Sequence, residues 1–222
     1  MTGSPILLSH TLDETTPAYG GAEGVQIRAK SSIANGDTAN TIDLELPNHI
    51  GTHVDLPLHF FAEAASLTDY PPEAWFFRTP FLVDVEAGSS GLIEPESVAH
   101  LPLGIDCLLL RTGHEKNRGE RAYWEAGPGL SPELGFWLRR ERPSVRAVGM
   151  DLISVTSRLH REAGRAAHRA FLDPAGHGEP IRLIEDMALQ GAPAALGAVL
   201  VSPLMLTAGD GAPVTVWAFP TP

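Results

Sequence analysis

Apolar residues recur along the chain in short runs, and several of these runs alternate with polar residues. Alternation with a period of two is typical of half-buried β-strands, whose successive side chains point to opposite faces. Glycine and proline are scattered between the runs rather than gathered into one linker. The pattern predicts strands at residues 6–9, 25–29, 41–46, 81–85, 105–111, 145–151, 181–184, 198–204 and 214–219.

Helices are predicted in fewer places. Ser131 has the character of an N-cap, Pro132 suits the first helical position, and the helix should run to about residue 142 before Pro143 stops it. A second helix is expected over residues 157–172, and a weaker third over 94–100. Many strands with few helices indicate an α+β or mixed β/α layered fold. Without a linker or an internal repeat, we expect a single domain over residues 1–222.

Composition narrows the function classes. The formal net charge of -11 should repel phosphate backbones and anionic lipid, so we expect neither a nucleic-acid nor a membrane partner. The longest apolar stretch, 194–206, is interrupted by Ser202 and Pro203 and is too short to span a bilayer. The N-terminus lacks the pattern of a signal peptide, and the single cysteine, Cys107, excludes an intrachain disulfide. We expect a soluble, cytoplasmic protein.

The densest chemistry lies in the segment His-Ile-Gly-Thr-His-Val-Asp-Leu-Pro-Leu-His, residues 49–59. It holds His49, His53, Asp55 and His59, at offsets of four, two and four residues. Imidazole and carboxylate together suit zinc, manganese or iron(II). The alternative is a histidine-rich surface loop or a set of buried, hydrogen-bonded imidazoles. Because four such side chains fall so close together, the metal site is the favoured interpretation.

A regular element would not bring these side chains around one ion. A strand of six residues spans roughly 20 Å, and a helix that aligned His49 with His53 would turn Asp55 away from them. Gly51 can take backbone angles closed to other residues, and Pro57 breaks a strand ladder. We therefore predict that the segment is neither strand nor helix, but a tight turn that folds the side chains inward.

Two residues far along the chain are further candidates. His168 lies on a helix face of small residues, where it could equally be structural. Glu185 ends an apolar strand, and burying its carboxylate is costly unless it is paired or bound to a cation. Residue chemistry alone leaves the metal-binding and structural interpretations of both residues balanced.

The segment 49–59 resembles the signature of the cyclase-like metal-dependent hydrolase family, which includes bacterial kynurenine formamidases (arylformamidases) and isatin hydrolases. The resemblance continues in residues 13–20, in Gly149-Met-Asp151 with Ser154, and in the segment that holds Glu185. It implies the swivelling β/β/α fold of that family, one or two ions of Zn²⁺ or Mn²⁺, and a homodimer or higher homo-oligomer.

The resemblance also implies a role for each residue. His49, His53 and Asp55 would hold one metal, while Asp55 with the two distant candidates, His168 and Glu185, would hold a second or complete a single site. His59 would be the catalytic acid/base rather than a ligand.

Two positions depart from the family pattern. The segment 173–180 is longer than the expected link between helix and glutamate, so His177 is a rival ligand to His168. Tyr19 stands where the formamidases typically have a tryptophan near the substrate. We expect Tyr19 and Phe60 to contact a small-molecule substrate.

The expected chemistry is hydrolysis of an amide bond, in an N-formyl anilide or a cyclic amide, by metal-activated water. A cyclase or dehydratase reaction on the same metal site is the alternative, and a metal-binding protein without turnover is a third interpretation. The extra His59, set beyond Pro57, favours catalysis. No glycine-rich phosphate loop is present, so no organic cofactor is expected.

Overall fold

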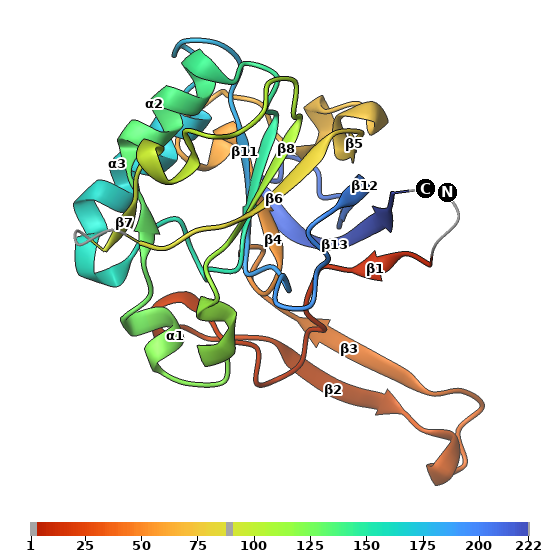
Figure 1. The fold of residues 1–222 in the computed structure, drawn as a ribbon. Helices are drawn as coiled ribbons and strands as arrows, with labels where there is room; N and C mark the ends of the chain where they lie inside the picture. The colour runs from red at the N-terminus through yellow and green to blue at the C-terminus, as the bar shows by residue number, and fades with distance from the viewer. Residues whose placement is uncertain (1–3, 88–90, 222) are drawn as a thin grey trace.

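A mixed sheet of nine strands forms the centre of the computed structural model, which describes residues 4–87 and 91–221. Along the sheet the order is β5-β12-β13-β4-β11-β10-β8-β6, and β1 pairs with β13 (Figure 1). The strands are β1 (Ile6–Leu7), β4 (His53–Asp55), β5 (Phe76–Phe77), β6 (Pro80–Asp84), β8 (Cys107–Arg111), β10 (Ala147–Met150), β11 (Arg182–Glu185), β12 (Leu196–Pro203) and β13 (Gly211–Pro220).

The sheet has a parallel and an antiparallel part, and β4 joins them. Strands β6, β8, β10 and β11 run parallel to one another. Strand β4 is antiparallel to β11 on one side and to β13 on the other, so it is hydrogen-bonded along both edges. The short segment that carries the histidine motif is thus a central strand, with little freedom to move.

Helices α2 (Pro132–Glu141) and α3 (Arg161–Leu172) pack against each other over the parallel part of the sheet, and a short helix, α1 (Ala122–Glu125), lies apart from them (Figure 1). Ser131 caps α2, because its Oγ accepts a hydrogen bond from the Leu134 N–H at 3.1 Å. Leu134 and Leu138 of α2 and Phe171 of α3 belong to the apolar core on this face of the sheet. A second apolar core lies on the other side.

Outside the main sheet, β2 (Gln26–Ser31) and β3 (Thr41–Glu45) form a two-stranded hairpin that projects from the body as an arm (Figure 1). Its strands pair only with each other. Two more short strands, β7 (Leu92–Ile93) and β9 (Gly129–Leu130), form a small parallel pair beside α3.

Every predicted strand is present, with boundaries that differ by a few residues. The predicted helix over 131–142 is α2, and the one over 157–172 begins with a 3₁₀ turn at Arg158–His160 before α3. The helix expected over 94–100 is wrong: the chain makes only a 3₁₀ turn, Pro95–Val98. That segment is too short to present a full amphipathic face, so tertiary packing does not stabilise a longer helix there.

The mixed β/α layered fold is confirmed. One sheet collects strands from Ile6 to Pro220, with helices over one face. Cys107, the single cysteine, lies fully buried in β8. Among the described residues, no helix has the length and apolar character needed to cross a membrane.

Candidate metal centre

The histidine motif begins with a tight turn and then enters the sheet. Gly51 has a φ of 59°, in the left-handed region, and a Cβ there would lie 2.3 Å from the Leu12 side chain. A 3₁₀ turn, Pro57–His59, follows β4. The prediction that the whole segment avoids regular structure is wrong for its middle, because His53–Asp55 is a strand. The strand is short enough that His53 and Asp55, two residues apart, share one face.

Strand register brings Glu185 to the same face. In the antiparallel pairing of β11 with β4, Glu185 lies directly opposite His53, and Leu183 lies opposite Asp55. Directly opposed residues project to the same side of a sheet. Residues more than a hundred positions apart in the chain therefore meet without any special loop.

His168 reaches the cluster from α3. Its Nε2 lies 3.4 Å from Oδ2 of Asp55 and 3.5 Å from Oε1 of Glu185, while its Nδ1 lies 2.9 Å from the Gly164 carbonyl oxygen. The rival His177 does not reach it: His177 is exposed, and its carbonyl accepts a hydrogen bond from Nε of Arg139. The longer link between helix and strand is thus accommodated at the surface.

Four side chains, those of His53, Asp55, His168 and Glu185, form a ring of contacts. Nε2 of His53 lies 3.5 Å from Oδ1 of Asp55 and 3.4 Å from Oε2 of Glu185, and His168 completes the ring with the contacts above. All four residues are 5% exposed or less. These separations exceed ordinary hydrogen-bond lengths. They are close to the ~3.4 Å between two ligands of an ion with bonds of ~2.1 Å, and His168 contacts the second oxygen of each carboxylate. The residues present fit a divalent metal.

The second nitrogen of each imidazole supports this arrangement. Nδ1 of His53 lies 2.8 Å from the Gly51 carbonyl oxygen, as Nδ1 of His168 lies near Gly164. An Nδ1–H that donates to a carbonyl leaves Nε2 free to bind a cation. Glu185 is fixed in turn, because its Oε1 accepts hydrogen bonds from Val155 N–H at 2.7 Å and from Ser154 Oγ at 3.3 Å.

The electrostatics of the ring call for positive charge. Burial lowers the pKa of His53 and His168, but contact with Glu185 and Asp55 outweighs it and raises their pKa to about 9 and about 10. Burial would raise the pKa of Asp55, yet the imidazoles of His168 and His49 hold it well below its usual range. Two carboxylates so deeply buried need a cation between them, which protonated imidazoles or a bound metal supplies.

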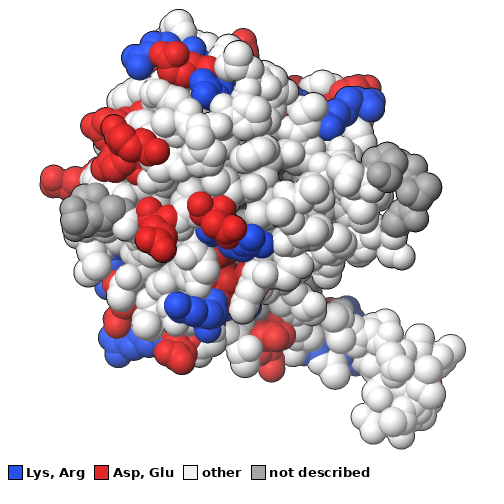
Figure 2. Space-filling model, in the orientation of Figure 1, with Lys and Arg blue, Asp and Glu red and all other residues white. Residues whose placement is uncertain are grey.

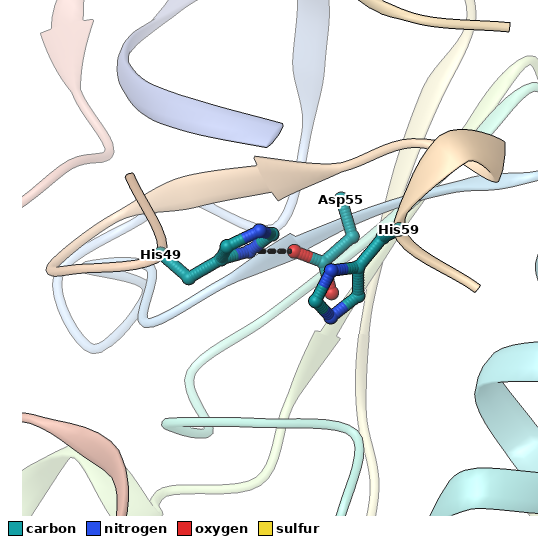
Figure 3. Close-up of side chains that lie close together, drawn as sticks. All are labelled: His49, Asp55 and His59. Carbon is teal, nitrogen blue, oxygen red and sulfur yellow. Dashed lines mark hydrogen bonds and ion pairs between the residues drawn. The ribbon is translucent and has the colours of Figure 1, made fainter. Parts of the chain in front are cut away.

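His49 and His59 form a second group beside the ring (Figure 3). Nδ1 of His49 lies 2.8 Å from Oδ1 of Asp55, and the imidazoles of His49 and His59 are tilted against each other at 4.1 Å between centroids. Donor atoms of His49, Asp55 and His59 lie within 4.8 Å of one another, as do those of His53, Asp55 and Glu185. Asp55 belongs to both groups, in the position of a bridging ligand.

Asp210 is a member of the site that sequence reasoning missed. Its Oδ2 lies 2.9 Å from Nε2 of His49 and 2.8 Å from Nδ1 of His59, and its Oδ1 accepts a hydrogen bond from Nδ2 of Asn48. Partial burial raises the pKa of Asp210, but the hydrogen bonds from the two imidazoles lower it overall. In the sequence, an aspartate between two glycines looks like any turn residue.

Gly211 makes this approach possible. It pairs with Asp55 in the register of β13 with β4. A Cβ on Gly211 would lie 2.5 Å from Cε1 of His49 and 2.5 Å from the carbonyl oxygen of Val54. Any side chain there would therefore push the imidazole away from both of its carboxylates.

A cavity of about 300 Å³ opens above the cluster. Tyr19 and Phe60, the expected substrate contacts, both line it, and the Phe60 ring stacks on His168 at 4.7 Å and 13°. Trp75, another aromatic residue near the motif, packs into the apolar core instead. Two arginines of α3, Arg161 and Arg165, also line the cavity, and sequence reasoning did not single them out.

Comparison with known proteins agrees with this geometry. Residues 6–157 match the family model described as "Putative cyclase". The "Cyclase-like protein 1" of Arabidopsis thaliana is 28% identical over 93% of this chain and 81% of its own length. The "Kynurenine formamidase" of Geobacillus thermodenitrificans is 26% identical over 94% of each chain.

Solved structures show the same fold. Isatin hydrolase A from Labrenzia aggregata superposes with a TM-score of 0.82, at 24% identity, and the match covers 99% of this chain and 94% of that one. A structure titled "Potential Metal-Dependent Hydrolase With Cyclase Activity" gives a TM-score of 0.73 at 20% identity, covering 99% of this chain and 98% of that one. At these identities the likeness concerns the fold.

Proposed function

The chain belongs to the cyclase family, and from that premise we propose that it is a metal-dependent hydrolase that cleaves the amide bond of an N-formyl anilide or a cyclic amide. Relatives named as a kynurenine formamidase and, by fold, as an isatin hydrolase support this substrate class. Both names describe attack on an amide carbonyl whose nitrogen carries an aryl ring.

The observation that carries the proposal is the ring of two imidazoles and two carboxylates at the floor of the cavity. Its N···O contacts of 3.4–3.5 Å are longer than ordinary hydrogen bonds and close to the separation of two ligands of one ion. We assign His53, Asp55, His168 and Glu185 to one divalent ion, and His49 with Asp55 to a second where two bind. Zinc and manganese are the candidate metals because both accept nitrogen and oxygen ligands.

A divalent ion held there would polarise the substrate carbonyl and lower the pKa of a bound water towards ~7. His59 is placed to carry the proton. Its Nδ1 faces Asp210, which leaves Nε2 for the substrate and for water. His59 accepts a proton from the attacking water and returns it to the leaving nitrogen. Asp210 holds the ring in this orientation.

Apolar walls complete the site. Phe60, Tyr19 and Ile153 line the cavity together with the polar cluster. These side chains would pack against the aryl ring of an anilide and would exclude bulk water from the reacting carbonyl.

The proposal is tested by turnover after metal removal and reconstitution. Protein stripped with a chelator and reloaded with zinc or manganese should release formate from formanilides or open the ring of isatin. A panel of formanilide, isatin and an aromatic lactone separates amide from ester preference. Equal turnover by protein shown to be metal-free would refute a metal-dependent mechanism.

Ring closure is the second candidate reaction. The solved structure titled with cyclase activity favours it, and closing a cyclic amide is the reverse of opening one, so the same groups would serve. Incubating the metal-loaded protein with the open-chain amino acid and following loss of the free amine distinguishes the two directions.

We also propose that the protein is a homodimer in which the β2–β3 arm covers a second copy. A lone two-stranded hairpin is marginally stable in water, and this one exposes Ile33, Ile42 and Leu44 at 58%, 60% and 53%. The outer end of the arm shows almost no charged side chains on the face seen in Figure 2. Light scattering at micromolar concentration tests the dimer, and Ile42→Asp should shift it towards monomer.

A further inference from the structure

The wall of the cavity formed by α3 carries a row of basic side chains. Arg161, Arg165 and His168 lie at positions i, i+4 and i+7 of the helix, so they share one face. All three line the cavity. At ~1.5 Å of rise per residue, Arg165 lies about 5 Å and Arg161 about 10 Å along the helix axis from His168. His168 contacts the metal cluster, so the row leads away from it.

Among the described residues, neither guanidinium has a hydrogen-bond or ion-pair partner. Within residues 4–87 and 91–221, Arg161 and Arg165 make no hydrogen bond and no ion pair. Other arginines of the chain behave differently: Arg118 pairs with Asp186, and Arg182 donates to backbone carbonyls. Both cavity arginines are exposed to the cavity and to solvent.

Folding stability does not account for this placement. Like charges four residues apart on a helix repel each other. Arg161 is the first residue of α3, where the helix dipole disfavours a positive charge. Arg161 and Arg165 are therefore unpaired cations at positions where positive charge destabilises the helix. This placement indicates a role in binding rather than in packing.

The negative charge around the cavity indicates a function for the basic side chains on α3. The chain has a net charge of -11, Asp55 and Glu185 line the cavity, and Asp210 contacts two histidines that line it. An anionic ligand approaching such a site is repelled unless fixed cations offset the field. Tyr19 also lines the cavity, and its buried phenol oxygen has no hydrogen-bond partner in the described part of the chain.

We propose that Arg161 and Arg165 form an anion subsite that binds a carboxylate carried by the substrate. The inference rests on the proposed hydrolase function and narrows its substrate class to aryl amides that bear a carboxylate at the end remote from the scissile bond. The guanidinium fork suits a carboxylate through two parallel hydrogen bonds. Because the two arginines follow one another along α3 away from His168, the carboxylate belongs at the end of the substrate remote from the scissile bond.

Matched substrates test the subsite. Metal-loaded protein is assayed with 4-formamidobenzoate and with its neutral partner, 4-formamidobenzamide. We expect the acid to be preferred by on the order of 10-fold or more in kcat/KM, as one charge-assisted contact supplies. Arg165→Gln, Arg161→Gln and the double variant should remove the preference through KM with little change in kcat. Arg140→Gln, an exposed arginine on α2, removes the same charge and should keep the preference.

A charge reversal gives the opposite prediction. Arg165→Glu should favour 4-formamidobenzylamine, which carries an ammonium group in place of the carboxylate. Equal kcat/KM for acid and amide in the unaltered protein would overturn the subsite. An equal loss of kcat/KM on both substrates in the glutamine variants would also overturn it, because such a loss does not depend on the carboxylate.

A binding measurement separates this inference from the proposed function. Calorimetry of benzoate and benzamide on the metal-loaded protein needs no turnover. Benzoate binding that weakens in the double arginine variant, but not in Arg140→Gln, supports the subsite even if no formanilide is cleaved. Benzoate affinity unchanged in the double variant overturns it even if the hydrolase activity is present.

Discussion

Two neighbouring carboxylates at the end of β11, Glu185 and Asp186, are both buried and are satisfied in opposite ways. Asp186 receives three hydrogen bonds from the guanidinium of Arg118 at 2.7–3.1 Å and one from Tyr123 Oη at 2.6 Å. Glu185 has imidazole neighbours at 3.4 and 3.5 Å. The fold thus places the guanidinium of Arg118 on Asp186, whereas the side chains nearest to Glu185 in these contacts are imidazoles.

The difference teaches how to recognise a binding site among buried charges. Where a carboxylate only needs to be buried, an arginine and a tyrosine close on it at hydrogen-bond distance, as they do at Asp186. At Glu185 the two imidazole partners stand apart at the spacing of metal ligands, and the residues face a cavity. Spacing and access, rather than burial or charge, separate the two clusters.

The largest expected effect follows from removing the divalent ion that we propose binds at Glu185. Chelation should bring turnover to background and lower the melting temperature, because a bound metal stabilises the folded state. Glu185→Gln should reproduce the loss, and zinc or manganese should restore only the unaltered protein. Metal analysis and thermal unfolding check this. Asp186→Asn is the matched control, and its metal content should stay at the level of the unaltered protein.

His59→Ala should lose turnover by roughly 10²–10⁴-fold, the usual contribution of an acid/base group, and should keep its metal. His53→Ala and Asp55→Ala should instead lose the metal of the ring, and His49→Ala should lose the second ion where two bind. Metal content measured beside kcat in the four variants decides the roles. A metal-free His59→Ala protein would make His59 a ligand and leave the proton carrier elsewhere.

At Asp186 the expected loss is in stability. Asp186→Asn removes the anion from a buried ion pair and should cost about 3–5 kcal/mol in the free energy of unfolding, because Arg118 is left uncompensated. Denaturant titration of the metal-free protein measures it. For comparison, Glu185→Gln in the metal-free protein should cost much less. Equal losses for the two variants would erase the distinction between the clusters.

The smallest expected effect concerns Asp210, which acts through His59 and His49. Asp210→Asn should lower kcat by about 10–100-fold, the range for partners of ligands and catalytic groups. Because Asp210 positions the ring and does not contact the substrate, KM should change little. Steady-state kinetics with the metal-loaded variant provide the measurement, and a change confined to KM would assign Asp210 to substrate binding instead.

Much of the site was predictable because its chemistry is local. The segment 49–59 carries four of the candidate residues within eleven positions, and the serine and proline signals at Ser131, Pro132 and Pro143 place α2 correctly. The apolar alternation placed the strands of the main sheet within a few residues. Local patterns suffice where the determining forces act between neighbours in the chain.

What the sequence by itself determined was the set of residues able to bind a metal and the elements that carry most of them. The tertiary structure decided which of these meet. Register places Glu185 opposite His53, and α3 delivers His168 while His177 stays at the surface. Asp210 and the arginines of α3 joined the site only through folding. The reason is physical: strand pairing and helix packing fix distances between residues far apart in sequence, and no local pattern records those distances.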